Sequence, residues 1–513
     1  MTAEPRQEAS WNRLALWGPA VAVFLLHAIF ATTYGIFRDE LYYLACAARL
    51  DWGYVDHPPL IAAMTALWTL LFGDSLLAIR ILAALAGAGA VAISGSLARR
   101  LGGGNFAVAL TGLAVGLSPI VLGLTSVLSM NVFDLLFWAL ACRLAAALLD
   151  GGDERLWLAF GAVAGLGLLN KISMLFLGFG LALGVVATRR FDLLRSRYLW
   201  LGGALAGLLF APHLVWQHLH GWPTREFMTN ASQSKNVALA PVDFLTAQLL
   251  QTGPLHAVVW ISGLLALLFA LRFRPWRSLG VAYLAILVVM LSTAAKPYYL
   301  APAYPMLWAA GAVAIEAWTR GRRGGFVWRA AAVGSVVLSG LALAPLARPI
   351  LPVDAYVRYA RALGQEPGTD ERKSLGRLPQ FFADMQEWRG LAEAVGVAAD
   401  RLTRDERRSA CVFGQNYGEA SAVAYFGGEL HLPPAISAHN SWYLWGLGAC
   451  SGEVLLVLGD DAFSLGKLFA EVELGATFDC RDCMPYEDEL PIWIVRRPLA
   501  DLAGLWPRVR HFD

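Results

Sequence analysis

Long apolar runs, each about the length of a membrane-crossing helix, recur through most of the sequence before residue 350. A helix needs about 20 mostly apolar residues to cross the hydrocarbon of a bilayer. Because lipid offers no partner for backbone polar groups, such segments are expected to be α-helices. We predict about eleven spans, near residues 14–34, 76–98, 105–124, 130–149, 156–170, 171–187, 199–219, 254–271, 279–295, 299–318 and 327–346.

The composition indicates a membrane protein with a water-soluble part. Only 16% of the 513 residues are charged, well below the ~25% that is typical of soluble globular proteins. About half of these charged residues lie after residue 349. We therefore predict a polytopic α-helical membrane domain, residues 1–348, followed by a soluble C-terminal domain, residues 349–513. The net charge of +2 gives no sign of a nucleic-acid partner.

The C-terminal domain alternates strand-like and helix-like patterns, which is typical of a small α/β sheet. We predict strands at 410–413, 453–458 and 491–495, with helices at 418–426 and 464–471. Ligands bind where the strands of such sheets end. Asn416, Tyr417 and Glu419 follow the first strand and are candidate acceptor contacts. His439 and Asn440 lie in a polar, aromatic loop that either contacts the acceptor or packs between domains.

The distribution of arginine predicts the orientation in the membrane. Most of the arginines that flank the predicted spans fall on one side, and cytoplasmic loops are enriched in such residues. We therefore expect a multi-pass protein of the cell (inner) membrane with a cytoplasmic N-terminus. With an odd number of spans, the C-terminal domain is extracytoplasmic.

Cysteine placement agrees with this orientation. Disulfides can form in an extracytoplasmic domain, but spacing alone does not give the pairing. A zinc site built on the closest pair would need two further ligands, and we find none with suitable spacing. The cysteines of the C-terminal domain are Cys411, Cys450, Cys480 and Cys483.

The loop after the first predicted span concentrates ionisable and aromatic residues. Adjacent acids at a membrane boundary are costly unless they are paired or functional. A carboxylate there can act as a general base on an acceptor hydroxyl or amine. We therefore predict Asp39 and Glu40 as the catalytic residues. The alternative is that both are solvated acids at the interface.

The same loop holds further candidates for substrate binding. Residues 41–50 have the spacing of a helix lying at the interface, and Pro58-Pro59 prevents a continuous helix into the next span. Alternatively, the tyrosines belong to an aromatic belt and the Asp-His pair caps a helix. The candidates are Tyr42, Tyr43, Asp56 and His57.

A second group of candidates lies at the outer ends of other spans. Lys171 and Lys296 are predicted on the outer side of the membrane, although positive charges are usually enriched on the cytoplasmic side. Each could bind a lipid phosphate as a point charge. A lone lysine at an interface also commonly extends to water. Asp134, near the start of a span, either contacts substrate or favours the helix dipole. Tyr298 and Tyr299 follow Lys296 directly.

The sequence gives no sign of a cofactor. No histidine and acidic cluster has convincing metal-ligand spacing. The Gly-x-x-x-x-Gly-Lys loop that holds nucleotide phosphates is absent from the sequence. We therefore predict a metal-independent enzyme, although the acidic loop leaves a divalent cation open.

Three motifs resemble a known family. They are Arg38-Asp39-Glu40-x-Tyr42-Tyr43, Asp56-His57-Pro58-Pro59 and Lys296-x-Tyr298-Tyr299-Leu300-x-Pro302. The chain resembles the bacterial protein-mannosyltransferase-like, lipid-A-modifying glycosyltransferases of the GT-C superfamily, families 39 and 83. The resemblance covers residues 14–320. It extends into the C-terminal domain through His439-Asn440-Ser441-Trp442 and Cys480-x-x-Cys483.

The resemblance implies a GT-C fold and a specific reaction. Sugar would pass from a polyprenyl-phosphate donor to an extracytoplasmic lipid, glycan or protein acceptor. It maps the acidic residue of the active site onto Asp39, with Glu40 beside it. It maps the phosphate-binding basic residues onto Lys296 and Lys171. A base and a phosphate site on opposite sides of the anomeric carbon would give inversion.

Two other functions compete with this prediction. A flippase or transporter of lipid-linked sugars would place broken helices and charges at the bilayer midplane, often with internal repeats. Here the charges cluster toward one face and no repeat is evident. A non-catalytic scaffold that binds an envelope partner through its C-terminal domain is the third alternative.

Overall fold

The computed structural model describes residues 12–293 and 295–513. The predicted cytoplasmic N-terminus lies outside the described residues. The chain divides into two compact units. The helical unit comprises Met1–Ala31, Arg80–Pro212 and Ala238–Ile350, and the sheet unit comprises Thr32–Ile79, His213–Val237 and Leu351–Asp513. The sheet unit therefore gathers three segments that are far apart in the sequence.

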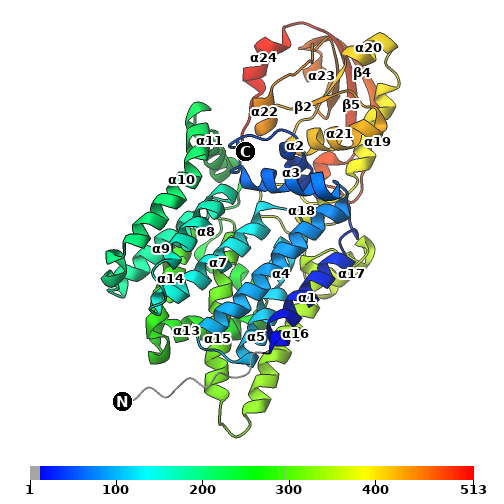
Figure 1. Cartoon of the computed structure of the whole chain (residues 1–513). Coiled ribbons are helices and arrows are strands. Elements are labelled where there is room, and N and C mark those ends of the chain that lie inside the picture. Colours follow the sequence, from blue (N-terminus) through cyan, green and yellow to red (C-terminus); the bar gives the residue numbers. More distant parts are fainter. Residues whose placement is uncertain (1–11, 294) are drawn as a thin grey trace. The chain divides into compact units, whose positions relative to one another are not determined.

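The helical unit is built from apolar helices, many of which run alongside one another (Figure 1). Helices α9 and α14 pack together, as do α7 and α8, and α13 and α15. Its main helices are α1 (Arg13–Ile29), α4 (Leu76–Arg100), α5 (Asn105–Gly116), α6 (Pro119–Leu124), α7 (Met130–Leu149), α8 (Leu156–Asn170), α9 (Met174–Ala187), α10 (Arg197–Leu219), α12 (Pro241–Thr252), α13 (Ala257–Phe269), α14 (Arg277–Leu291), α15 (Tyr304–Thr319) and α16 (Gly325–Ala347). The ends of α4 and α10 extend into the sheet unit.

Fewer helices can span a membrane by themselves than the sequence predicted. Among the described residues, five helical segments are long and apolar enough: Leu76–Arg100, Met130–Leu149, Arg197–Leu219, Leu271–Leu291 and Gly325–Ala347. A sixth span arises if Pro241–Thr252 and Pro254–Phe269, which meet at 94°, are counted as one. The prediction of about eleven full-length spans is therefore too high, because several apolar segments form shorter helices.

Proline explains two of these shorter helices. The predicted span 105–124 divides between α5 and α6, and Pro119 is the first residue of α6. The predicted span 299–318 opens with a 3₁₀ turn, η5 (Pro297–Ala303), before α15 begins. Proline lacks the backbone donor that a continuing helix requires, so it sits at helix starts and breaks longer runs.

Glycine allows the closest helix packing in the helical unit. A Cβ on Gly263 of α13 would collide with the backbone of Leu307, and one on Gly311 of α15 would collide with the backbone of Val259. Small residues at such crossings let two helix backbones approach, which is a common packing device in membranes.

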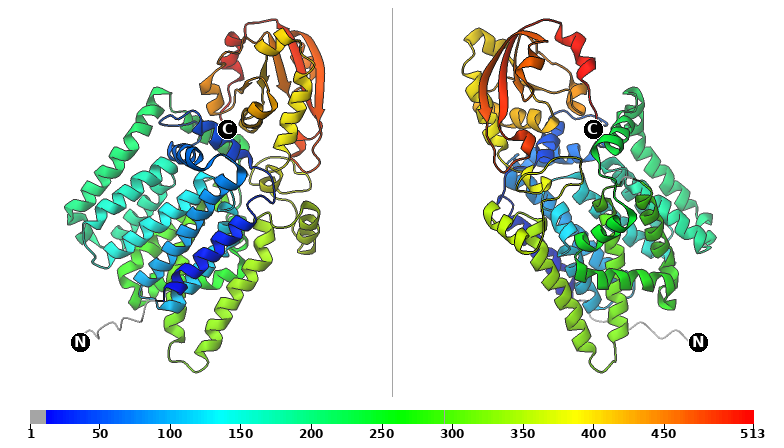
Figure 2. Two further views of the ribbon diagram at one scale, coloured as in Figure 1. Left: turned by 45° about the vertical axis from the view of Figure 1, so that its right-hand side comes forward. Right: turned by 180° about the vertical axis from the view of Figure 1, so that it is seen from behind.

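The sheet unit contains a five-stranded mixed sheet with the order β2-β1-β3-β5-β4. Strands β1, β2 and β3 are parallel, and β5 runs antiparallel to both β3 and β4. Figure 2 shows β4 and β5 as the longest arrows. The strands are β1 (Cys411–Phe413), β2 (Ala435–Ile436), β3 (Val454–Leu458), β4 (Phe469–Phe478) and β5 (Leu490–Pro498).

Helices from all three segments complete the sheet unit. Helix α2 packs against both α3 and α21, and α19 packs against α21 and β4. The helices are α2 (Arg38–Ala47), α3 (Leu60–Phe72), α11 (Pro223–Asn230), α17 (Val353–Ala362), α18 (Gln380–Ala383), α19 (Trp388–Ala399), α20 (Arg404–Ser409), α21 (Tyr417–Leu430), α22 (Ser441–Trp445), α23 (Ala462–Leu465) and α24 (Leu502–Val509).

One predicted helix of this unit is wrong. The segment 464–471 was expected to be helical, but α23 ends at Leu465 and strand β4 begins at Phe469. Along β4, the apolar residues Phe469, Val472 and Leu474 are separated by polar or small residues. This near-alternation is typical of a strand. The predicted strands at 410–413, 453–458 and 491–495 and the helix over 41–50 correspond to β1, β3, β5 and α2.

The four cysteines of this unit form two disulfides. Cys411 pairs with Cys450, and Cys480 pairs with Cys483. Both pairs lie within the C-terminal segment of the sheet unit.

Candidate active site

The N-terminus of α2 places two adjacent acids in different environments. The Glu40 side chain is fully buried, and its Oε2 accepts a hydrogen bond from the backbone N–H of Phe37 at 2.8 Å. This bond satisfies one of the amides that a helix start leaves without an internal partner. Asp39 instead keeps 33% of its side chain exposed. Of the two predicted catalytic acids, Asp39 is therefore the one that solvent and substrate can reach.

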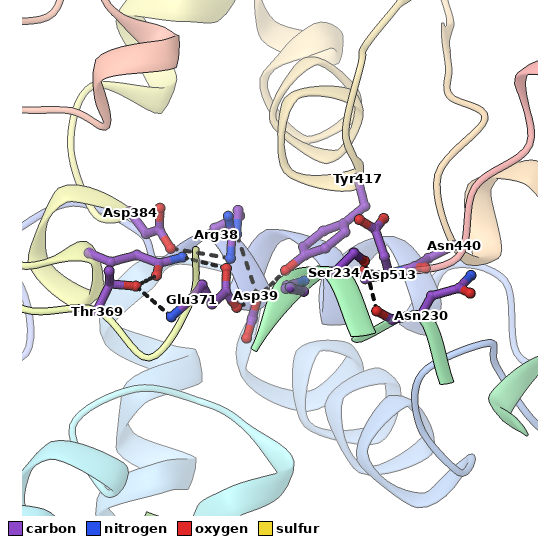
Figure 3. Close-up of polar contacts among 12 residues, drawn as sticks. Arg38, Asp39, Asn230, Ser234, Thr369, Glu371, Asp384, Tyr417, Asn440 and Asp513 are labelled. Atoms are coloured by element: carbon purple, nitrogen blue, oxygen red, sulfur yellow. Dashed lines mark hydrogen bonds and ion pairs between the residues drawn. The ribbon is translucent and has the colours of Figure 1, made fainter. Parts of the chain in front are cut away.

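Asp39 is held by groups from distant parts of the sequence. The Tyr417 hydroxyl donates a hydrogen bond of 2.8 Å to its Oδ1, and Arg38 Nε lies 3.9 Å from the same oxygen. Figure 3 shows Tyr417 directed at Asp39, with Arg38 close by. The donor from α21 and the cation from α2 together fix the orientation of this carboxylate.

Arg38 is enclosed on several sides. Its Nη2 lies 3.3 Å from Asp384 Oδ2, and its Nη1 donates to the Tyr486 hydroxyl at 3.3 Å. The guanidinium carbon also lies 5.3 Å from the centre of the Tyr417 ring. A Cβ on Gly418 would meet Arg38 Cγ at 2.5 Å. Glycine at position 418 therefore lets α21 approach the arginine.

Further acids surround this arginine. Burial raises the pKa of Asp384 while Arg38 opposes the rise, and burial also raises the pKa of Glu487, reinforced by the Asp384 charge. Desolvation disfavours the charged form of a carboxyl, which explains the direction. Sequence reasoning missed Asp384, Tyr486 and Glu487, because only tertiary structure brings them to residue 38.

The four substrate-binding candidates of the first loop form a compact aromatic cluster. The Tyr42 hydroxyl donates to Asp56 Oδ1 at 2.9 Å, and its ring lies 4.7 Å from that of Tyr417. His57 is fully buried, 5.1 Å from the Tyr43 ring, and its Nδ1 contacts the backbone oxygen of Pro58 at 2.8 Å. His57 therefore packs inside the unit, and Asp56 orients Tyr42.

The candidates after β1 begin helix α21. The Asn416 side chain accepts a hydrogen bond from the Glu419 N–H at 3.0 Å, as an N-cap does. Glu419 is buried and accepts from the backbone of Gln415 and the side chain of Asn416, both at 2.7 Å. Burial raises the pKa of Glu419 to about 7. These contacts organise the end of β1 next to Tyr417.

His439 and Asn440 lie beside Asp513. His439 Nδ1 accepts the backbone N–H of Tyr417 at 3.3 Å, which places the ring proton on Nε2. Nε2 lies 3.2 Å from Asp513 Oδ1, and this hydrogen bond lowers the pKa of the Asp513 carboxyl. The Asn440 amide also donates to the backbone oxygen of Asp513 at 3.3 Å.

One group of described residues could hold a metal by distance. Ligand atoms of His439, His511 and Asp513 all lie within 4.8 Å of one another. The hydrogen bond from the Tyr417 N–H is incompatible with metal on His439 Nε2, because that ring would then need its proton on Nδ1. The arrangement therefore favours a histidine–carboxylate hydrogen bond over a metal centre.

Two cavities of the sheet unit adjoin these residues. The first, of about 240 Å³, is lined by Arg38 and Tyr417, and the second, of about 470 Å³, is lined by Gln415 and Asp460. Both are also lined by a shared set of side chains. These are Lys373, Asn416, His439, Tyr486 and Asp513.

The helical unit brings together four candidates that are far apart in sequence. Lys171 Nζ donates to Asn131 Oδ1 at 2.7 Å and lies 3.8 Å from Asp134 Oδ2. The same ammonium lies 5.8 Å and 5.0 Å from the ring centres of Tyr298 and Tyr299. The cation is thus held between one carboxylate and two aromatic rings.

Lys296 adds a second positive charge to this region. It interacts electrostatically with Lys171, and Tyr298 and Tyr299 follow it in the 3₁₀ turn η5. Two ammonium groups in one region are of the kind that bind an anionic ligand.

Comparison with known proteins gives the class of this protein. Residues 56–216 match the model of the dolichyl-phosphate-mannose-protein mannosyltransferase family. The crystal structure of ArnT from Cupriavidus metallidurans bound to undecaprenyl phosphate aligns with a TM-score of 0.63 at 16% identity, over 94% of this chain and 98% of that one. The apo structure of the same protein aligns with the same TM-score over 93% and 97%. No curated protein matches by sequence.

The chain thus has the fold of ArnT over nearly its whole length, and over residues 56–216 it is similar to a family of glycosyltransferases. Within that class, the match over residues 56–216 relates the chain to the dolichyl-phosphate-mannose-protein mannosyltransferases. The resemblance drawn from the first-loop motifs and from the Lys296 motif is confirmed at this level.

Proposed function

We propose that this enzyme transfers a sugar from a polyprenyl-phosphate donor to an extracytoplasmic acceptor, with inversion at the anomeric carbon. The family match names a dolichyl-phosphate sugar, and the ArnT structure of the same fold holds undecaprenyl phosphate. Both are polyprenyl phosphates. The acceptor is a lipid, a glycan or a protein, and the reaction takes place on the side of the membrane opposite the cytoplasmic N-terminus.

The exposed carboxylate of Asp39 carries the proposal. An acceptor hydroxyl needs a base as it attacks, and Asp39 is solvent-accessible and oriented by Tyr417 and Arg38. Glu40 is committed to capping α2, so its catalytic contribution is to hold the start of the helix in place. We therefore assign proton removal to Asp39.

The lysines of the helical unit suit the leaving group. A polyprenyl phosphate leaves as an anion, and Lys171 and Lys296 would stabilise its developing charge. Asp134 and Asn131 orient the Lys171 ammonium, and Tyr298 and Tyr299 flank it. In this proposal the sugar is attacked from the face opposite the bound phosphate.

Replacement of Asp39 tests the proposal. In membranes supplied with polyprenyl-phosphate sugars and acceptor extracts, Asp39→Asn should lower transfer by about 10²–10⁴-fold, the usual contribution of a general base. Asp51→Asn, an exposed acid of the same loop, should retain activity. Mass spectrometry of the products measures both. Undiminished transfer by Asp39→Asn would refute the base assignment. Movement of lipid-linked sugar across liposomes without transfer would favour a flippase.

A further inference from the structure

The two cavities of the sheet unit share five lining residues, and we consider them together as one cleft at the carboxyl ends of the parallel strands. Gln415 and Asn416 follow β1, while Gly459 and Asp460 follow β3, and all four line the cleft. Ligands of open α/β sheets bind at this edge. The larger cavity, about 470 Å³, by itself lies within the ~300–1,000 Å³ range of small-molecule sites.

Residues with polar or charged side chains make up most of the lining of the cleft. Apart from Gly459, Leu490 and Pro491, every described residue that lines it carries a polar or charged side chain. Ligand pockets are usually lined mainly by apolar and aromatic groups, which pay for burial of apolar ligands. A ligand covered in hydroxyl groups therefore gains hydrogen bonds along its length, which a lipid tail or an apolar peptide segment cannot make.

The polar groups are of the kind that bind neighbouring hydroxyls. Carboxylates accept two hydrogen bonds or more, and amides both donate and accept. Asp460 and Glu489 are exposed carboxylates of the cleft, Gln415 supplies an amide, and Lys373 supplies an ammonium. Tyr486 adds an aromatic ring whose face is already used by Lys373, 4.7 Å away. Planar carboxylates and amides of this kind match the neighbouring hydroxyl groups of a sugar chain.

The cleft also reaches the proposed base. Tyr417 and Arg38 line its smaller cavity, and these are the two residues that contact Asp39. At the far end, Asp460, Asp488 and Glu489 make the wall acidic, which disfavours a polyanion along that wall. A chain lying in the cleft would present one end toward Asp39.

We propose that this cleft binds the acceptor, and that the acceptor is an oligosaccharide rather than a peptide or a lipid chain. That the bound oligosaccharide is the acceptor rests on the proposed function. Binding itself is independent of transfer, so the two can fail separately. A free glycan, a glycolipid head group and a glycoprotein share the required chemistry.

The first experiment measures binding without a donor. Full-length protein in nanodiscs would be applied to an array of neutral and charged oligosaccharides, with serine- and threonine-containing peptides and lipid head groups lacking sugar printed beside them. We expect binding to a subset of oligosaccharides. The double variant Asp460→Asn, Glu489→Gln should weaken it at least tenfold, since asparagine tolerates the positive φ of 66° at position 460. Asp405→Asn, whose side chain is 95% exposed on α20, serves as the control.

The second experiment uses the bound oligosaccharides as acceptors. Lys373→Met and the double variant should raise the acceptor KM at least tenfold while the donor KM and kcat stay unchanged. Glycan binding without any transfer would refute the proposed function, but the assignment of the cleft as an oligosaccharide-binding site would stand. Binding only to peptides or to lipids, or glycan binding that the double variant leaves unchanged, would overturn the inference.

Discussion

The two units handle ionisable residues in opposite ways. In the helical unit, charges are few, and Glu316 and Lys171 each have a small set of partners that the other does not share. Glu316 Oε2, for example, accepts the backbone N–H groups of Gly104 and Ala107 at 3.0 and 2.8 Å, at the start of α5. In the sheet unit, one arginine joins Asp39, Asp384, Tyr417 and Tyr486 in a shared network.

This difference shows how each unit can contribute to chemistry. A cation held by a few fixed partners in a largely apolar environment acts as a fixed point charge, since little else around it can screen or reorient it. A network fixes the direction of each of its members, and removal of one changes the others. A substitution of a charged residue in the helical unit should therefore remove the stabilisation that its charge provides. A substitution in the sheet unit should instead change the orientation of a neighbouring side chain.

After Asp39→Asn, the largest effect is expected in the helical unit. Lys171→Met should lower kcat by about 10²–10³-fold, because one missing stabiliser of transition-state charge typically costs that much. Asp134 would also lose its cation, so the thermal midpoint should be checked beside the rate. Lys467→Met, an exposed lysine of the sheet unit, is the matched control. A Lys171→Met enzyme with unchanged kcat would remove the phosphate role from this cluster.

An intermediate effect is expected from Tyr417. Tyr417→Phe keeps the ring against Tyr42 but deletes the hydroxyl that donates to Asp39. A hydrogen bond to a charged group is worth about 1.5–3 kcal/mol, so transfer at neutral pH should fall roughly tenfold or more.

The control for that experiment is Tyr425→Phe. The Tyr425 hydroxyl donates to the backbone oxygen of Asp74 at 3.0 Å and has no contact with Asp39. Its transfer rate should match that of the wild type. If Tyr417→Phe leaves the transfer rate unchanged, then Tyr417 acts only through packing and its hydrogen bond does not position the base.

The sequence predicted the local parts of this network and missed its distant ones. Asp39 and α2 were found because charge at a membrane boundary and helical spacing are both local signals. The separate role of Glu40 was not found, since a bond to the Phe37 amide depends on backbone geometry. Asp384 and Tyr486 lie more than 340 residues from Arg38, and no spacing rule joins them.

In the helical unit, too, the sequence predicted local features but not tertiary contacts. Hydropathy located the apolar segments, but it could not tell a full span from a shorter helix broken at Pro119. The meeting of Lys171 with Tyr298 and Tyr299 depends on helix packing, although the sequence identified each residue separately. Composition thus predicts which residues are costly to bury, and tertiary structure decides which of them meet.

The smallest effect concerns stability and its dependence on pH. Burial raises the pKa of Glu487 in the folded protein above its unfolded value. The folded state therefore binds the proton more tightly, and the stability that this proton provides is lost as the pH rises through the folded pKa. Glutamine does not titrate, so Glu487→Gln should match the wild type at pH 5 and be more stable at pH 9.

A pKa shift of one corresponds to about 1.4 kcal/mol of unfolding free energy. For a domain the size of the sheet unit, about 1 kcal/mol of unfolding free energy moves the Tm by roughly 2–4 °C. Thermal unfolding at pH 5, 7 and 9, followed by fluorescence, should thus show a Tm difference that grows by a few degrees with pH. Glu453→Gln, an exposed acid before β3, should show no such trend. A difference that stays constant with pH would mean that Glu487 keeps its charge when buried, and that Arg38 stabilises the acids around it more strongly than burial penalises them.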